Sequence, residues 1–180
     1  MVAAEGIRAR NRSAIEAEIL RVGREHLGRY GAAALSLRAV ARDLGMASSA
    51  VYRYVDSRDE LLTRLIVAAY DSLADTVDDA LARLPDPAGP DPSFRAIVLA
   101  THRWAITHPH EYALIYGSPV PDYDAPPERT TPAGTRVTNR LIQVLAPYAD
   151  PERETARDRQ ALGDGPDDLP GQTGLDAGVL

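Results

Sequence analysis

The chain has 180 residues and a formal net charge of −6 at pH 7, from 26 acidic and 20 basic residues, and every basic residue is arginine. It has no cysteine, no signal-peptide core and no apolar stretch long enough to cross a bilayer, so disulfides and thiol chemistry are excluded and we expect a cytoplasmic protein without a membrane partner. Residues 1–55 hold nine Arg against five acidic residues and residues 56–180 hold eleven against twenty-one, a distribution typical of a protein that presents one end to phosphate.

The N-terminal part predicts one amphipathic helix. Residues 1–10 show no periodicity, so we expect a flexible N-terminus there. A capping box formed by Ser13 and Glu16 then starts the helix, which ends at Gly31. We interpret His26 on this helix as a core or rim residue and not as a ligand. The apolar residues that share one face are Ile15, Ile19, Val22, Leu27 and Tyr30.

Residues 36–55 predict two short helices joined by a tight turn. Ser36 can cap the first helix, and Gly45 can adopt the left-handed conformation that ends it. The second helix restarts shortly after this glycine and buries Val51 and Val55. Such a pair is a helix-turn-helix, whose second helix enters the major groove of DNA. The apolar face of the first helix consists of Leu37, Val40, Ala41 and Leu44.

The next segment makes this interpretation more specific. Ser57 and Glu60 have capping-box spacing, so a long helix starts there with Arg58 in its first turn. From Ser36 to Leu62 the chain resembles the N-terminal domain of TetR-family transcriptional regulators. Ala47 stands where that family commonly has a capping serine, so we expect Ser48 to cap the second helix. The shared pattern is Ser36, Val40-Ala41, Gly45-Met46, Val51-Tyr52-Arg53-Tyr54, Ser57-Arg58 and Glu60-Leu61-Leu62.

The resemblance implies which residues contact DNA. Tyr52 and Arg58 would hold phosphates, and Tyr54 fits either a phosphate or a groove contact. Ser48, Ser49 and Arg53 would face the groove. Spacing alone also allows another interpretation, in which the aromatic rings pack on the first helix and the arginines are solvated. The predicted DNA-contacting set is Ser36, Arg38, Ser48, Ser49, Tyr52, Arg53, Tyr54 and Arg58.

A long fourth helix is predicted over Arg58–Leu84. At about 1.5 Å per residue it is about 40 Å long, so it can link the helix-turn-helix mechanically to the rest of the chain. Four aspartates mark its outer face, and we interpret them as solvated and not as a metal site, because nothing nearby supplies further ligands. These are Asp71, Asp75, Asp78 and Asp79.

Beyond the linker at residues 85–90, three more helices are predicted. Asp91 caps the first, Pro109 starts a second that ends at Gly117, and a proline-rich loop over residues 117–130 leads to a third over Thr131–Ala146. Four residues along the first two admit two interpretations: an ordinary helical core, or an apolar ligand pocket with a few polar groups. They are Trp104, His108, Tyr112 and Tyr116.

The fold class is therefore all-α, without strand patterns or internal repeats. We expect a flexible segment over residues 1–10, a DNA-binding domain over 11–62, an effector-binding and dimerisation domain over 63–148 and a disordered tail over 149–180. The tail is rich in Gly, Pro and acidic residues and lacks the long amphipathic helices through which the family usually dimerises. We therefore expect a homodimer weaker than is usual for the family.

The sequence contains no catalytic, metal-binding or cofactor-binding motif, so we expect neither an enzyme nor a cofactor. The resemblance implies a regulator that binds double-stranded DNA at a palindromic operator, most simply a repressor released by a small apolar or aromatic effector. A helical effector-binding or scaffold protein that has lost operator binding is the competing hypothesis. Salt-dependent binding to a palindromic promoter fragment distinguishes the two.

Overall fold

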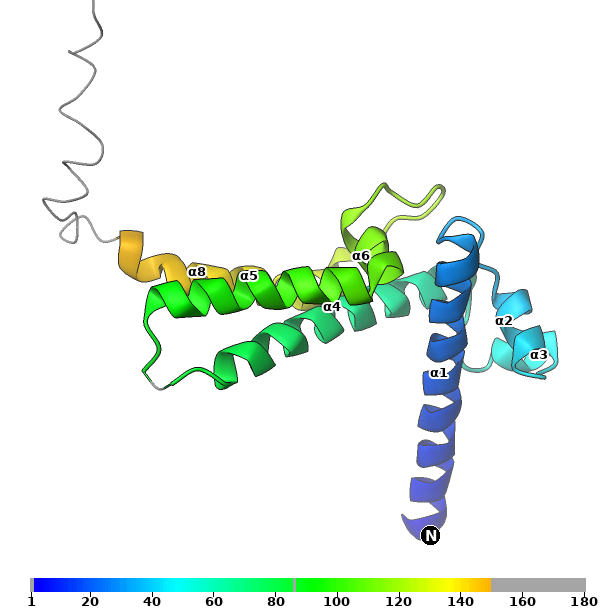
Figure 1. Cartoon of the computed structure of the whole chain (residues 1–180). Coiled ribbons are helices and arrows are strands. Elements are labelled where there is room, and N and C mark those ends of the chain that lie inside the picture. Colours follow the sequence, from blue (N-terminus) through cyan, green and yellow to red (C-terminus); the bar gives the residue numbers. More distant parts are fainter. Residues whose placement is uncertain (1, 86, 150–180) are drawn as a thin grey trace, which may run out of the picture. The chain divides into compact units, whose positions relative to one another are not determined.

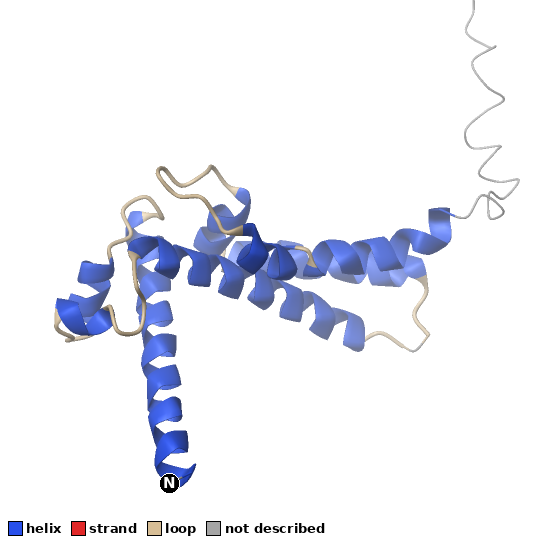
Figure 2. Cartoon of the chain, turned by 180° about the vertical axis from the view of Figure 1, so that it is seen from behind, coloured by secondary structure: helices blue, strands red, loops and turns tan. Residues whose placement is uncertain are grey.

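The computed structural model describes residues 2–85 and 87–149, and all regular structure within these ranges is helical, as predicted (Figures 1 and 2). Residues 1–144 form one compact unit; of the second unit, residues 145–180, only 145–149 are described. The predicted tail from residue 150 on, and the weak dimer inferred from it, lie outside the described residues. The elements are α1 Val2–Tyr30, α2 Leu37–Asp43, α3 Ser48–Val51, α4 Arg58–Ala82, α5 Pro90–Thr107, α6 Pro109–Tyr116, α7 Pro127–Gly134, α8 Arg136–Leu145 and the 3-10 helix η1 Ala146–Ala149.

The helix-turn-helix forms as the sequence predicts, except at the two ends of α3. This helix already ends at Val51, so Tyr52 and Arg53 lie in the turn after it and not on the helix. The Ser36 Oγ accepts a hydrogen bond from the Ala39 amide at 3.4 Å, and Gly45 has φ +65°, which ends α2 in a left-handed turn. Our expectation that Ser48 caps α3 was wrong: Ser48 is the first helical residue, and Ala47 before it offers no side-chain cap. Instead, the backbone carbonyl of Ala47 accepts from the Ala50 amide at 2.8 Å.

Helix α1 is longer than predicted. It begins at Val2 and not at Ser13, so residues 2–10 are helical where we expected a flexible segment. The Ser13–Glu16 capping box lies inside the helix and caps nothing. The Glu16 carboxylate binds Arg12 at 2.9 Å instead, an i, i+4 pair that supports the helix across the expected start.

Two hydrophobic clusters share α4. The first joins α1, α2 and α3 to the beginning of α4, with Val51 and Val55 fully buried in it. The second joins the later turns of α4 to α5, and helices α4 and α5 pack on one another (Figure 1). The expected domain boundary near residue 62 falls inside α4, so this helix belongs to both clusters and links them rigidly.

The later helices differ from prediction at their boundaries. Helix α5 begins at Pro90 with Gly89 at its N-cap, so Asp91 does not cap it. Helix α6 agrees with the prediction. The expected loop over residues 117–130 already contains the start of α7, because Pro127 has the fixed φ suited to a first helical turn and needs no hydrogen bond from its nitrogen. Thr135 separates α7 from α8, where one helix was expected.

Three of the four aspartates on α4, namely Asp71, Asp75 and Asp78, form an ion-pair site and not merely the solvated face that we predicted. The Arg136 guanidinium, at the start of α8, lies 2.8 Å from Asp71, 2.7 Å from Asp75 and 3.1 Å from Asp78. Arg140, one turn further along α8, binds Asp78 at 2.8 Å. Asp75 and Asp78 follow Asp71 by four and seven residues, so all three lie on one face of α4. Arg140 follows Arg136 by four residues, so the two arginines also lie on one face of their helix. This complementary spacing is the sequence signal that was missed.

Candidate nucleic-acid interface

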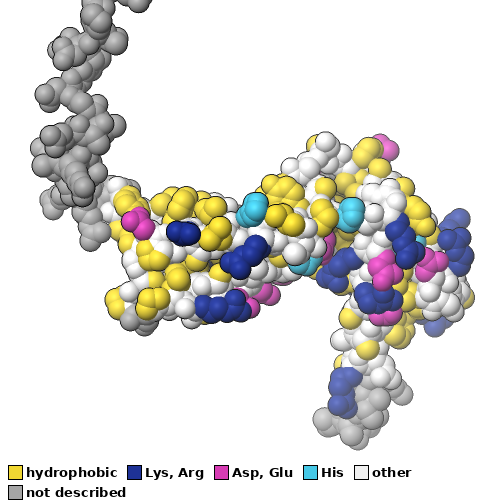
Figure 3. All heavy atoms as spheres, in the orientation of Figure 1, with side chains coloured by type: hydrophobic (Ala, Val, Ile, Leu, Met, Phe, Trp, Pro, Cys, Tyr) yellow, Lys and Arg dark blue, Asp and Glu magenta, His cyan; other side chains and the backbone are white. Residues whose placement is uncertain are grey.

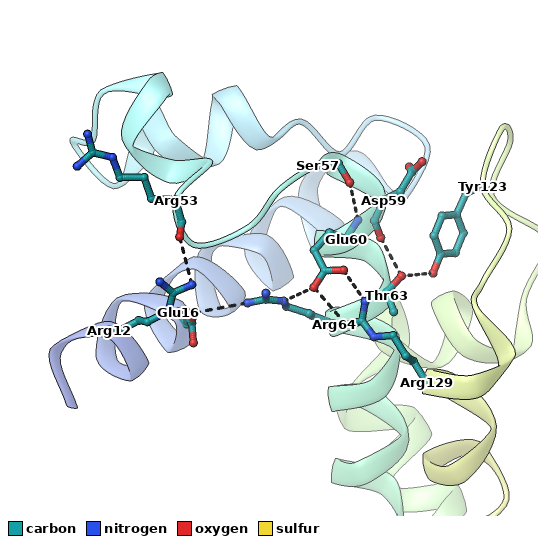
Figure 4. A network of polar contacts seen from close by, with 10 residues as sticks. All are labelled: Arg12, Glu16, Arg53, Ser57, Asp59, Glu60, Thr63, Arg64, Tyr123 and Arg129. Atoms are coloured by element: carbon teal, nitrogen blue, oxygen red, sulfur yellow. Dashed lines mark hydrogen bonds and ion pairs between the residues drawn. The ribbon is translucent and has the colours of Figure 1, made fainter. Parts of the chain in front are cut away.

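Four of the predicted DNA-contacting residues are exposed on α3 and the turn after it. Ser48, Ser49 and Arg53 are exposed, and Tyr52 is 41% exposed. Within the described part of the chain, the Arg53 guanidinium has no hydrogen-bond or ion-pair partner, and it points away from α1 (Figure 4). Val51 and Val55, on the opposite face of the same segment, anchor it in the core. The arrangement presents two hydroxyls, a phenol and a guanidinium to an external partner.

The start of α2 adds a basic hollow beside α3. Its polar lining comes from Ser36, Arg38, Arg42 and Ser48, and it opens between the first turns of the two helices. Arginine side chains gather over α2 and α3 in the space-filling view (Figure 3, right). Guanidinium and hydroxyl groups in such a hollow are suited to anionic oxygens such as those of phosphate.

Arg58 takes a position that the sequence did not predict. Its Nε donates to the Leu35 carbonyl at 3.3 Å, and its NH2 group donates to the carbonyls of Ala32 and Ala33 at 3.3 and 3.2 Å. These carbonyls belong to the loop between α1 and α2. Arg58 therefore fixes that loop against the start of α4, and most of its donors are already used inside the protein.

Tyr54 is half-buried, and its ring lies beneath the Arg12 guanidinium, with 5.5 Å between the guanidinium carbon and the ring centroid. Arg12 also donates to the backbone carbonyl of Arg53 at 3.2 Å (Figure 4). The turn after α3 is therefore held against α1 by a cation–π contact and a hydrogen bond. The interpretation in which an aromatic ring packs on the first helix thus describes Tyr54, whereas Tyr52 is exposed.

The predicted ligand-pocket residues form two separate groups. Trp104 is 2% exposed, donates from its indole nitrogen to the Ser72 Oγ at 3.0 Å and stacks on His108 with 5.1 Å between ring centroids. Tyr112 and Tyr116 are exposed, with ring centroids 5.2 Å apart, and Tyr116 also contacts Tyr70 edge-on. Partial desolvation, with a smaller effect of the neighbouring phenols of Tyr70 and Tyr112, raises the pKa of the Tyr116 phenol. Trp104 thus occupies a core position, and the tyrosines lie on the surface of α6.

A hollow lies instead under the loop between α6 and α7. Its volume is about 290 Å³, and its walls combine apolar side chains with tyrosine rings. The principal lining residues are Ile66, Tyr70, Ile115, Val120, Tyr123 and Thr130. We predicted a proline-rich loop here without a site, and the available signal is the presence of Val120 and Tyr123 among its prolines.

Two family models match this chain, one in its N-terminal part and one in its C-terminal part. Residues 19–65 match the family model for bacterial regulatory proteins of the tetR family, and residues 94–164 match that for the tetracyclin repressor-like C-terminal domain. The HTH-type transcriptional regulators Mb1846 of Mycobacterium bovis and Rv1816 of Mycobacterium tuberculosis are each 53% identical to the chain over 141 residues, which are 78% of this chain. The chain spans 60% of the length of these relatives.

Solved structures agree with this placement. The crystal structure of SCO4313 superposes with a TM-score of 0.69 at 36% identity, covering 83% of this chain and 70% of that one. The TetR-family transcriptional regulator PfmR from Thermus thermophilus shares the fold, with a TM-score of 0.56 at 21% identity over 71% of this chain and 68% of that one. These relatives and families are regulators and not enzymes. Within the described residues, no helix is both long and apolar enough to cross a membrane.

Proposed function

Because the chain belongs to the TetR family of bacterial regulatory proteins, we propose that it binds double-stranded DNA through α2 and α3 and regulates transcription. The observation that carries this proposal is the exposed polar face of α3. Arg53 points outward from a segment that Val51 anchors in the core, and Arg38 on α2 lines the hollow that reaches the start of α3. Such a rigid support holds base-reading side chains in register with the groove.

The proposed mode of action is repression by a homodimer on a palindromic operator, in the cytoplasm. Two copies related by a two-fold axis would place two α3 helices on half-sites about 34–36 Å apart, one turn of DNA. Arg53, Ser48 and Ser49 would read base edges. Arg38, Ser36 and Tyr52 would hold phosphates, with Arg58 and Tyr54 supporting the interface from behind.

We place the effector site in the hollow beneath the α6–α7 loop. A volume of about 290 Å³ is near the lower limit of ligand pockets, so the effector would be small, and the apolar and aromatic lining favours an apolar or aromatic molecule. Tyr70 lines the hollow and contacts Tyr116, while Trp104 lies in the neighbouring α4–α5 core. An effector that binds more tightly to a conformer with displaced helix-turn-helices would release DNA by shifting the population.

Footprinting on the protein's own upstream DNA tests the proposal. We expect a protected palindrome and an affinity that falls linearly with the logarithm of salt concentration. Equal, weak affinity for every duplex would favour the competing hypothesis of an effector-binding or scaffold protein without operator binding. The matched control is the Arg53→Ala variant, which should need a higher protein concentration to give the footprint while keeping its helical content.

A further inference from the structure

A continuous path of polar contacts runs from α7 to the end of α3 (Figure 4). On α7, the Arg129 guanidinium donates to both carboxylate oxygens of Glu60, with its NH2 group 3.1 Å from Oε1. Glu60 lies in the first turn of α4, where its amide donates to the capping Ser57 Oγ at 3.0 Å. The path therefore begins with a two-point contact between α7 and the first turn of α4.

Glu60 is the junction of this path. The same carboxylate accepts from the Arg64 Nε at 2.6 Å, so two arginines from different helices share it. The Glu60 side chain is only 18% exposed. Hydrogen bonds from Arg129, and secondarily from Arg64, hold the pKa of Glu60 below its usual value, so the carboxylate stays ionised at neutral pH.

From Glu60 the path crosses to α1 and ends on the DNA-binding segment. The Arg64 guanidinium lies 3.9 Å from the Glu16 carboxylate, and Glu16 binds Arg12 at 2.9 Å. Arg12 then donates to the Arg53 carbonyl at 3.2 Å. This carbonyl belongs to the residue whose guanidinium points outward, so the last contact acts directly on the backbone that aims it (Figure 4).

A second contact ties the same turn of α4 to the effector hollow. The buried Thr63 Oγ1 donates its only proton to the Asp59 carbonyl at 2.9 Å, so the Tyr123 hydroxyl, also at 2.9 Å, must donate to Thr63. Tyr123 lines the hollow beneath the α6–α7 loop. A molecule that enters this hollow therefore meets a side chain bonded to Thr63, one turn of α4 after Glu60.

We propose that Arg129 is a positioning residue for DNA binding, which sets the placement of α3 through Glu60, Arg64, Glu16 and Arg12. The inference rests on the proposed DNA-binding function. If these contacts were ordinary surface ion pairs, each would contribute little, and removing Arg129 from α7 would leave DNA affinity unchanged. If they form one path, removing Arg129 loosens the Arg53 backbone although Arg129 itself does not contact DNA.

The test is a double-mutant cycle on Arg129→Ala and Arg12→Ala, read as affinity for the footprinted operator across a salt titration. We expect Arg129→Ala to weaken binding about three- to ten-fold, within the range of about two- to thirty-fold typical of coupling through such networks, with an unchanged salt slope. In the Arg12→Ala background, Arg129→Ala should have no further effect, because the path is already cut. Additive losses, or a reduced salt slope for Arg129→Ala, would overturn the proposal.

Arg140→Ala is the matched control, since it also removes an ion pair to α4, with Asp78, but lies outside the path. It should leave operator affinity unchanged. Hydrogen exchange of the free protein gives a second readout: the amides of residues 53–55 should exchange faster in Arg129→Ala than in Arg140→Ala, and equal rates would contradict the inference. If the wild-type chain binds no DNA, the proposed function fails; if it binds and Arg129→Ala binds equally well, only this inference fails.

Discussion

His26 and Asp43 join the last turns of α1 to the end of α2, with 2.7 Å between the His26 Nε2 and the Asp43 Oδ2. His26 is 2% exposed, and Asp43 is the last residue of α2, two residues before the glycine turn. The contact therefore sets where the turn toward α3 begins. It also satisfies the ring nitrogen of a buried histidine, as expected for a core residue and not a ligand.

We predict that His26→Ala lowers the free energy of unfolding by about 1–3 kcal/mol, because it removes a buried ring and leaves Asp43 without this partner. Urea denaturation followed by circular dichroism measures the change. Arg42→Ala is the control: that side chain is 78% exposed on the same helix, and its loss should change stability by less than about 0.5 kcal/mol. Equal effects of the two substitutions would show that the contact contributes nothing.

The same contact predicts a dependence of stability on pH. The hydrogen bond from His26 lowers the pKa of Asp43, with smaller contributions from the charges of His26 and Arg42. A carboxyl group whose pKa is lower in the folded state stabilises the fold above its unfolded pKa of about 3.9, and this stabilisation is lost as pH falls through the folded-state pKa. In Asp43→Asn, the decline in stability below about pH 4 should be shallower than in the wild type. Parallel curves for the two proteins would contradict the assignment.

Substitutions of Arg53 and Arg38 should distinguish a contact with a base from a contact with a phosphate. Arg53→Ala should reduce operator affinity by about 1–3 kcal/mol and relax the preference at one base position, if the guanidinium binds a guanine edge. Arg38→Ala should weaken binding to all sequences alike and reduce the salt slope by about one. Binding titrations on the operator and on a scrambled duplex, at several salt concentrations, distinguish these patterns. If both variants behave alike, the division of roles is wrong.

Features of the fold that are set by residues close together in the chain could be predicted from the sequence. Local signals sufficed for the helix-turn-helix: Ser36 caps α2, Gly45 turns the chain and Ser57 caps α4, as predicted. The outward position of Arg53 could also be predicted from its offset of two residues from the buried Val51, because the helical period places such residues on opposite faces.

Contacts between distant segments could not be predicted in the same way. The guanidinium of Arg58 is placed by carbonyls more than twenty residues earlier, and Arg129 binds a carboxylate 69 residues away. Neither pairing leaves a periodic pattern in the sequence. Trp104 is similar: spacing placed it on an inward face but did not show that Ser72 takes its indole proton.

Arg58 itself gives a prediction opposite to the one that the family resemblance suggests. Since its donors reach three carbonyls of the α1–α2 loop, Arg58→Ala should lower the free energy of unfolding by about 1–3 kcal/mol. The salt slope of DNA binding should stay unchanged. A stable variant whose salt slope falls by about one would instead restore the role of a phosphate contact. Chemical denaturation and salt titration on the same preparation decide between these outcomes.

Trp104 provides an intrinsic probe of the α4–α5 core, because it is the only tryptophan in the chain. Its indole nitrogen donates to Ser72, two residues after Tyr70, which lines the proposed effector hollow. An effector that displaces this turn of α4 should therefore change the emission of Trp104 in parallel with the release of DNA. Ser72→Ala is the control that removes the indole partner without filling the hollow, and it should shift the emission without any effector. A compound that releases DNA while the emission stays constant would place the effector site away from this part of α4.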